Sequence, residues 1–316
     1  MKPINSGAYP TMITPYNNDK SVDFGAAAAL VEWFWEQGCD GIFAVCLSSE
    51  IFTLSLAERV RLAETVKRTA DKLAARDKSR GPMSIVASGH VSDNFKEQVG
   101  ELNVISDTGV DAVVLISNRF DIENTGFDKW KADAEKMLDC LPARVNLGLY
   151  ECPHPYKRVL DENILRWLVE SGRFSFIKDT CCDADEIKKR LEILNGSNIK
   201  LFNAHAGTLL QTLRDGADGY CGVMANYMPK PFVKLCSCWQ DDPWLADYLQ
   251  SFLSYAMTSE GMGYPISAKY YLDAFENVQM TPLSRTTDQS RFTERYKAGM
   301  AQLHDEIKAL EKNGFI

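Results

Sequence analysis

The stretch Gly109-Val-Asp111-Ala-Val-Val-Leu-Ile116 decides the fold class of this chain. It follows an amphipathic segment and is typical of a glycine that ends a helix, a short turn and a buried apolar strand. The same order recurs at Gly38-Cys-Asp-Gly-Ile-Phe-Ala-Val45 and at Gly216-Ala-Asp-Gly-Tyr-Cys-Gly-Val223. Apolar strands that alternate with helices indicate parallel strands covered by helices.

The same alternation extends over most of the chain. We expect strands near 8–14, 41–46, 83–88, 112–117, 145–150, 174–178, 199–203 and 219–224. We expect helices near 23–37, 56–76, 93–108, 127–140, 161–171, 183–195, 206–215 and 229–238. Eight such units predict an α/β fold, a TIM (β/α)8 barrel over residues 1–240. A doubly wound sheet is the alternative, although no G-x-G-x-x-G follows the first strand.

Residues 241–316 contain three more helical patterns, near 243–259, 264–277 and 287–312. No linker rich in proline, glycine or serine precedes them. We therefore expect a C-terminal helical extension packed on the barrel rather than an independent domain.

Composition narrows the function classes. The 316 residues carry a net charge of −8, which argues against a nucleic-acid or anionic-membrane partner. No apolar run reaches the roughly 18 residues of a membrane helix, and the first six residues lack the apolar stretch of a signal peptide, so a cytoplasmic protein is expected. The nine cysteines form no C-x-x-C pair, and we expect reduced, mostly buried thiols, no metal and no cofactor.

Lys178 is the leading candidate for a catalytic residue. The run Arg173-Phe-Ser-Phe-Ile-Lys178-Asp179-Thr180 places it at the carboxyl end of a strand, where barrels build their active sites. Burial there disfavours the ammonium form and leaves an amine that can attack a carbonyl to form a Schiff base. The alternative is a lysine that extends to solvent or pairs with Asp179.

Several runs, in this order and at these spacings, resemble the family of dihydrodipicolinate synthase and N-acetylneuraminate lyase. They are Tyr9-Pro-Thr-Met-Ile-Thr-Pro15, the stretch from Gly38 to Glu50, Tyr150-Glu-Cys-Pro153, Ile177-Lys-Asp-Thr180, Gly216-Ala-Asp-Gly219 and Ala225-Asn226. The resemblance covers nearly the whole chain. It implies a Schiff-base-forming lyase or aldolase acting on pyruvate or a related 2-oxo acid, on a TIM barrel with a C-terminal helical extension. It also implies a homo-oligomer, a tetramer or a dimer.

The resemblance assigns roles to particular residues. Lys178 would form the imine, and Tyr150 would move protons during imine formation and carbon–carbon bond chemistry. The loop Cys46-Leu-Ser48-Ser49-Glu50 would bind the carboxylate of the 2-oxo acid through backbone amides and the Ser48 hydroxyl, with Ser49 beside it.

Four further polar residues are predicted to bind substrate: Thr180, Asn203, His205 and Arg119. Each has a structural alternative. Thr180 could cap the following helix, His205 could be a structural hydrogen bonder, and Arg119 could pair with a surface carboxylate.

Departures from the family pattern affect substrate choice. Leu47 and Phe120 replace members of the synthase's proton relay, and Pro155 stands where its aldehyde-binding arginine is expected. Ala206 and Gly207 replace the lyase's acidic pair for sugar hydroxyls. Two alternatives therefore remain beside an aldolase: a dehydratase of 2-keto-3-deoxy sugar acids that uses the same imine, and a non-catalytic protein that binds 2-oxo acids.

Overall fold

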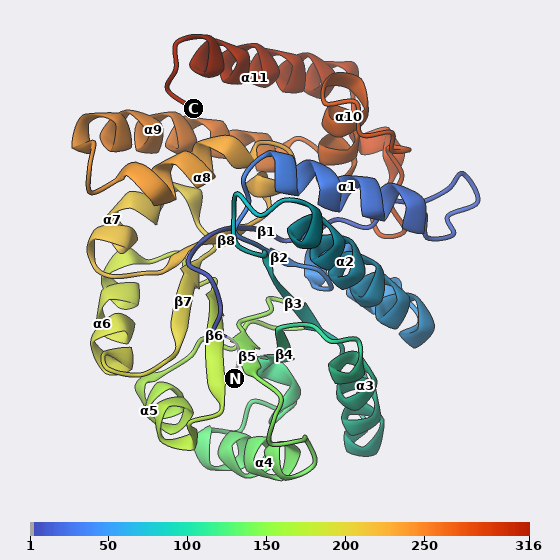
Figure 1. Cartoon of the computed structure of the whole chain (residues 1–316). Helices are drawn as coiled ribbons and strands as arrows, with labels where there is room; N and C mark the ends of the chain where they lie inside the picture. Colours follow the sequence, from blue (N-terminus) through green and yellow to red (C-terminus); the bar gives the residue numbers. More distant parts are fainter. Residues whose placement is uncertain (1–2) are drawn as a thin grey trace.

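A barrel of parallel strands forms the centre of the molecule (Figure 1). This computed structural model describes residues 3–316, and within them lie eight barrel strands. They are β1 (Gly7–Pro10), β2 (Gly41–Phe43), β3 (Ser84–Ser88), β4 (Ala112–Ile116), β5 (Leu147–Tyr150), β6 (Phe174–Asp179), β7 (Lys200–Asn203) and β8 (Gly219–Gly222). The ladder runs β1-β8-β7-β6-β5-β4-β3-β2, and a parallel bridge between Thr11 and Phe43 closes it. The predicted TIM barrel is confirmed, and the doubly wound alternative is wrong.

Helices surround the barrel on its outer side (Figure 1). They are α1 (Phe24–Glu36), α2 (Leu56–Arg76), α3 (Phe95–Asp107), α4 (Phe127–Asp139), α5 (Glu162–Ser171), α6 (Ala184–Leu194), α7 (Leu209–Arg214) and α8 (Pro229–Cys238). Short 3-10 turns follow several strands: η1 (Leu47–Ser49), η2 (Ile51–Thr53), η3 (Ser117–Arg119), η4 (Ala206–Thr208) and η5 (Met224–Asn226). The seventh helix begins later than predicted because η4 occupies its first turn.

Local sequence signals fix the ends of these helices. Gly38, Gly109 and Gly216 follow α1, α3 and α7 with φ of +84°, +80° and +107°, a region that favours glycine. At the start of α2, Ser55 accepts a hydrogen bond from the Glu58 amide (3.2 Å), and Glu58 accepts one from the Ser55 amide (2.8 Å). This reciprocal pair is a capping box of the Ser-x-x-Glu type.

The aspartate of each repeated Gly-x-Asp segment ties neighbouring strands together. Each carboxylate stands just before one strand and accepts a backbone N–H from the preceding strand. The pairs are Asp40 with Ala8 (2.9 Å), Asp111 with Ile85 (2.8 Å) and Asp218 with Leu201 (3.0 Å). The repeat thus fixes strand register as well as helix ends, a role that the sequence alone did not reveal.

Three helices follow the barrel: α9 (Pro243–Ala256), α10 (Ile266–Phe275) and α11 (Glu294–Lys312). They lie together beside α8 (Figure 1), and α9 also packs against η4. A buried carboxylate joins this extension to the loop after β2, because Glu50 accepts hydrogen bonds from the Ser284 hydroxyl (2.9 Å) and from the amides of Arg285 (2.6 Å) and Thr286 (2.9 Å). The extension therefore borders the carboxyl ends of the strands.

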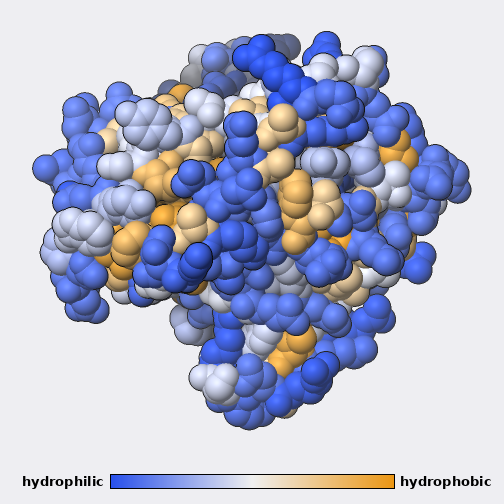
Figure 2. Space-filling model, turned by 90° about the horizontal axis from the view of Figure 1, so that it is seen from above, coloured by the Kyte–Doolittle hydropathy of each residue, from blue (hydrophilic) through white to orange (hydrophobic). Residues whose placement is uncertain are grey.

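The outer surface is mostly hydrophilic. On the face shown in Figure 2, hydrophobic residues form separate patches among charged and polar ones. Within residues 3–316, no helix combines the length and apolar character needed to span a bilayer.

Candidate active site

Lys178 and Tyr150 meet inside the barrel at the carboxyl ends of β6 and β5. The two residues are paired in the strand register, and the Lys178 Nζ lies 4.5 Å from the centre of the Tyr150 ring. The Phe43 ring lies 5.7 Å from the same nitrogen. Lys178 is 5% exposed and Tyr150 2%. The amine is therefore held against aromatic faces and does not extend to solvent.

A phenol and two thiols near this amine are neutral groups. Burial raises the pKa of the Tyr150 phenol well above its ordinary value, so it carries its proton at neutral pH. Burial also raises the pKa of the Cys221 thiol to about 12 and that of the Cys152 thiol, although the Lys178 charge opposes both shifts. The phenol is thus a proton donor beside the amine.

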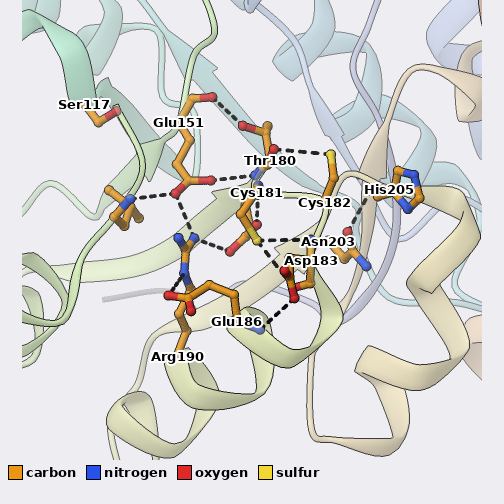
Figure 3. Close-up of polar contacts among 12 residues, drawn as sticks. Ser117, Glu151, Thr180, Cys181, Cys182, Asp183, Glu186, Arg190, Asn203 and His205 are labelled. Carbon is orange, nitrogen blue, oxygen red and sulfur yellow. Dashed lines mark hydrogen bonds and ion pairs between the residues drawn. The ribbon is translucent and has the colours of Figure 1, made fainter. Parts of the chain in front are cut away.

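Asp179 does not pair with Lys178, because a buried guanidinium holds it. Arg190 reaches from α6 and donates from one Nη1 to Glu151 (2.7 Å) and to Asp179 (2.5 Å), and all three side chains are at most 1% exposed (Figure 3). Burial and then the Asp179 charge raise the pKa of the Glu151 carboxyl, against the effect of Arg190. Since Glu151 follows Tyr150 and Asp179 follows Lys178, this clamp fixes the two site strands relative to each other.

Thr180 belongs to the clamp rather than to an open pocket. Its amide donates to the Glu151 carboxylate (2.7 Å) and its hydroxyl to the Glu151 carbonyl (2.8 Å), as Figure 3 shows. Its hydroxyl proton is therefore used within the protein, which favours a structural role, and the contact with substrate stays a prediction.

The two serines of the loop after β2 have different environments. Ser49 is fully buried, and its hydroxyl donates to the Met12 carbonyl (2.6 Å) and accepts from the Cys46 amide (3.0 Å). Ser48 is partly exposed, and its hydroxyl lies 3.1 Å from the Thr11 hydroxyl. Ser49 thus holds the loop in shape, and Ser48 is the serine of the pair that lines a cavity.

A cavity of about 610 Å³ opens next to Ser48. Its lining comes from the loop after β2, the loop after β8 and the extension: Leu47, Ser48, Glu50, Phe52, His154, Val223, Tyr264, Pro265, Thr286 and Thr287. Tyr264 and Thr287 also line a second cavity of about 660 Å³. Another cavity, of about 530 Å³, touches Phe174 at the start of β6 and so lies at the opposite end of the barrel.

Tyr264, which the sequence did not single out, brings a second phenol to this loop. Its hydroxyl accepts a hydrogen bond from Asn226 Nδ2 (3.2 Å). Burial raises the pKa of the Tyr264 phenol well above its ordinary value, against the opposing effect of a hydrogen bond with Ser48. No local motif marks Tyr264, because its role depends on how the extension folds back over the barrel.

Asn203 and His205 after β7 are used mainly within the protein. Asn203 is fully buried, its Nδ2 donates to Thr208 (3.0 Å) and Thr212 (3.1 Å), and its Oδ1 accepts from the His205 amide (2.7 Å). Asn203 therefore does not stand free at the pocket mouth. His205 lies beside Asn203 (Figure 3) and remains partly exposed, and burial lowers the pKa of its imidazole.

Arg119 pairs with a surface carboxylate, which is the structural role that the sequence left open for it. Its guanidinium pairs with Asp93 (2.6 Å) and lies 5.3 Å from the centre of the Phe52 ring. An arginine already neutralised by a carboxylate attracts an anionic substrate less strongly. Arg119 thus borders the cavity through Phe52 without presenting a free cation.

A second buried lysine, Lys269 in α10, was also missed by the sequence. Burial lowers the pKa of its amine to about 8 against the effect of Glu50, whose carboxylate lies 3.6 Å away. Burial alone therefore does not single out Lys178. Both amines lie over aromatic rings, since the Lys269 Nζ is 4.4 Å from the centre of the Tyr16 ring. What separates the two is the carboxylate: Lys269 is held by Glu50, whereas Lys178 makes no ion pair within residues 3–316.

Comparisons with known proteins match most of this chain. A sequence model of the "Dihydrodipicolinate synthetase family" matches residues 5–259. Proteins named 4-hydroxy-tetrahydrodipicolinate synthase from Shewanella sp. strains MR-4 and W3-18-1 are 27% and 26% identical over 232 residues, which cover 73% of this chain and 74% of theirs.

Solved structures share the fold at lower identity. CdNal from Clostridium difficile in complex with mannosamine has a TM-score of 0.81 at 17% identity, over 96% of this chain and 99% of that one. A prophage protein of the dihydrodipicolinic acid synthase family from E. coli K12, in complex with pyruvate, has a TM-score of 0.80 at 19% identity, over 96% and 98%. The chloride-inhibited dihydrodipicolinate synthase from Acinetobacter baumannii, also in complex with pyruvate, has a TM-score of 0.78 at 22% identity, over 98% of this chain and 99% of that one.

Proposed function

The chain belongs to the dihydrodipicolinate synthetase family of lyases, and from this we propose that it forms a Schiff base between Lys178 and pyruvate or a related 2-oxo acid. One observation carries the proposal: a buried amine lies 4.5 Å from a phenol ring at the carboxyl end of a barrel. Two solved relatives of the fold hold pyruvate, which supports the choice of substrate class.

The reaction begins at the keto carbon. The neutral Lys178 amine attacks it, the carbonyl oxygen leaves as water, and an imine links nitrogen to carbon. The departing oxygen needs a proton, and the Tyr150 phenol is placed to supply it. The Ser48 hydroxyl and the amides of its loop bind the carboxylate of the 2-oxo acid. The protonated imine then withdraws electrons from the neighbouring carbon, where a carbon–carbon bond forms or breaks.

Reduction of the imine tests this proposal directly. Incubation with pyruvate and borohydride should label one residue, Lys178, because reduction turns the imine into a stable secondary amine. Peptide mass spectrometry locates the label, and a Lys178→Arg variant should remain unlabelled. Lys269 is the internal control, since it is also buried and its pKa is lowered to about 8. Label on Lys269, or no label in the unmodified protein, would refute the proposal.

Substrate choice gives a second test. We expect this protein to be a poor dihydrodipicolinate synthase and a poor sialic acid lyase, with kcat/KM well below the roughly 10⁴ M⁻¹s⁻¹ typical of an enzyme on its own substrate. The first reaction needs a relay and an anchoring arginine, but Phe120 packs in the core against Trp130 (ring centres 5.5 Å apart) and Pro155 has no cationic side chain. The second needs acceptors for sugar hydroxyls, which the side chains of Ala206 and Gly207 do not offer.

Steady-state assays with pyruvate plus aspartate semialdehyde, and separately with N-acetylneuraminate, measure these rates. Loss of one charge-assisted contact with the substrate lowers kcat/KM by roughly ten- to a hundred-fold. A rate above the threshold on either substrate would show that other residues replace the missing contacts.

A further inference from the structure

We propose that Glu260, on the C-terminal extension, is a catalytic acid–base residue that moves the proton at the carbon next to the imine. The inference rests on the proposed function, because it names the group that serves the step after imine formation. No motif in the sequence pointed to this carboxyl.

Glu260 lies over the carboxyl ends of the strands. It belongs to η6 (Met257–Gly261), which follows α9 and packs on η5 after β8. Its charge acts on the ionisation of Tyr220 in β8, Tyr264 at the first cavity and Cys182 after β6. The charge of Lys178 in turn acts on Glu260. The packing on η5 and the shared cavity lining with Tyr264 place the carboxyl at the mouth of the barrel, near the end of β8.

The carboxyl also lines the space that a substrate would enter. It borders the cavity of about 660 Å³, which shares Tyr264 and Thr287 with the cavity beside Ser48. Besides Glu260 and Tyr264, the ionisable groups in this lining are Tyr296 and the exposed Arg291 and Arg295. A 2-oxo acid held at Ser48 and Lys178 would therefore have Glu260 on its open side.

Glu260 differs from the other site carboxylates in having no partner. Within residues 3–316 it makes no hydrogen bond or ion pair, whereas Glu151 is held by Arg190 (2.7 Å) and Glu50 by the loop 284–286. Burial raises the pKa of the Glu260 carboxyl to about 7, against the effect of Lys178. A desolvated carboxyl without a partner destabilises the fold, which is expected where chemistry requires it.

The step itself is a proton transfer. With pyruvate bound as the protonated imine, the Glu260 carboxylate accepts a proton from the methyl carbon, and the electron pair of that bond moves toward the positively charged imine nitrogen to give a neutral enamine and a neutral carboxylic acid. The reverse step returns a proton from Glu260 to the carbon. Aldol cleavage releases this enamine, and dehydration of a sugar acid passes through the corresponding enamine of that acid, which then loses its neighbouring hydroxyl as water. A carboxyl that titrates near neutrality can serve in both directions.

Pyruvate alone is a sufficient probe. In deuterated water, proton NMR follows the loss of the pyruvate methyl signal as enamine formation exchanges its protons. Glu260→Gln should slow this exchange at least about 100-fold, the usual lower range for a positioned proton-transfer group. Glu260→Asp should recover part of the rate, and Glu306→Gln, which changes an exposed carboxyl of α11, should leave it unchanged. Borohydride trapping at Lys178 should be equal in all four proteins.

The two hypotheses fail in different ways. Absence of trapping in the unmodified protein would overturn the proposed function, and this inference with it. Trapping with unchanged exchange in Glu260→Gln would overturn only the role of Glu260. A loss of both trapping and exchange in Glu260→Gln would also overturn the role of Glu260 in proton transfer. Such a result would mean that the residue maintains the shape of the site. The exchange rate should rise as pH increases through about 7, and this rise should disappear in Glu260→Gln.

Stability provides a readout that does not depend on activity. The folded-state pKa of Glu260, about 7, lies above its ordinary value of 4.5, so the ionised carboxyl destabilises the folded state increasingly as pH rises from about 4.5 to 7. Glu260→Gln should therefore raise the melting temperature more at pH 8 than at pH 5. An equal shift at both pH values would contradict the assigned ionisation and overturn the inference.

Discussion

Replacing Tyr150 by phenylalanine should slow methyl-proton exchange of pyruvate by roughly 10²–10⁴-fold, the range for loss of a positioned proton-transfer group. The ring would remain 4.5 Å from the Lys178 amine and in edge contact with Phe43, so packing is kept and only the hydroxyl is lost. Because the phenol serves imine formation, borohydride trapping should slow as well. That second effect distinguishes Tyr150 from Glu260, whose replacement leaves trapping unchanged.

Tyr9→Phe is the matched control. Tyr9 is another buried phenol of the barrel interior, but its hydroxyl donates to the Asn5 carbonyl (2.8 Å), before the start of β1. Its loss removes one internal hydrogen bond, worth about 0.5–1.5 kcal/mol, without touching the site. Time courses of exchange and of trapping compare the two variants. Near-normal rates in Tyr150→Phe would show that Tyr150 is a packing residue.

Replacing Arg190 by methionine should lower the free energy of unfolding by about 3–5 kcal/mol, the usual cost of leaving buried charges without their partner. The change leaves the carboxylates of Glu151 and Asp179 facing each other with no cation between them, and both are fully buried. Since these residues follow Tyr150 and Lys178, trapping with pyruvate should also slow. Urea denaturation measures the free energy of unfolding, and the rate of borohydride labelling at Lys178 measures imine formation at the site.

The control is an arginine in an exposed pair. Arg166 bonds Glu162 on the surface of α5 (2.7 Å), and Arg166→Met should change stability by only about 0.3–0.5 kcal/mol. Equal losses of unfolding free energy in Arg190→Met and Arg166→Met would show that the buried clamp stabilises the fold no more than an exposed ion pair does.

The pH dependence of Arg190→Met has a defined sign. Without the guanidinium, the opposing effect of Arg190 is lost, and the folded-state pKa of Glu151 rises further above its unfolded value. The stability deficit should therefore be complete at pH 8 and shrink as pH falls toward 4, where protonation removes the repulsion. A deficit that stays constant over this range would mean that lost packing, not charge, is its cause.

Helix ends, strand order and the two central site residues could all be predicted from local sequence. Gly38, Gly109 and Gly216 end helices because positive φ favours glycine, and this depends only on neighbouring residues. Lys178 and Tyr150 close consecutive strands, and parallel strands bring their carboxyl ends to one side of a barrel. Sequence order was therefore enough to expect the two side chains in one site.

Only the tertiary structure decided which polar side chains near the site remain free. Ser49, Thr180 and Asn203 have the right chemistry and position in the chain, but their polar atoms are taken up by contacts within the protein. Glu260 and Tyr264 reach the site from the extension, more than 80 residues after Lys178, with no motif to mark them. Helix and strand formation depends on periodic patterns of near neighbours, whereas a hydrogen bond or a desolvated carboxyl depends on which distant segments the folded chain brings together.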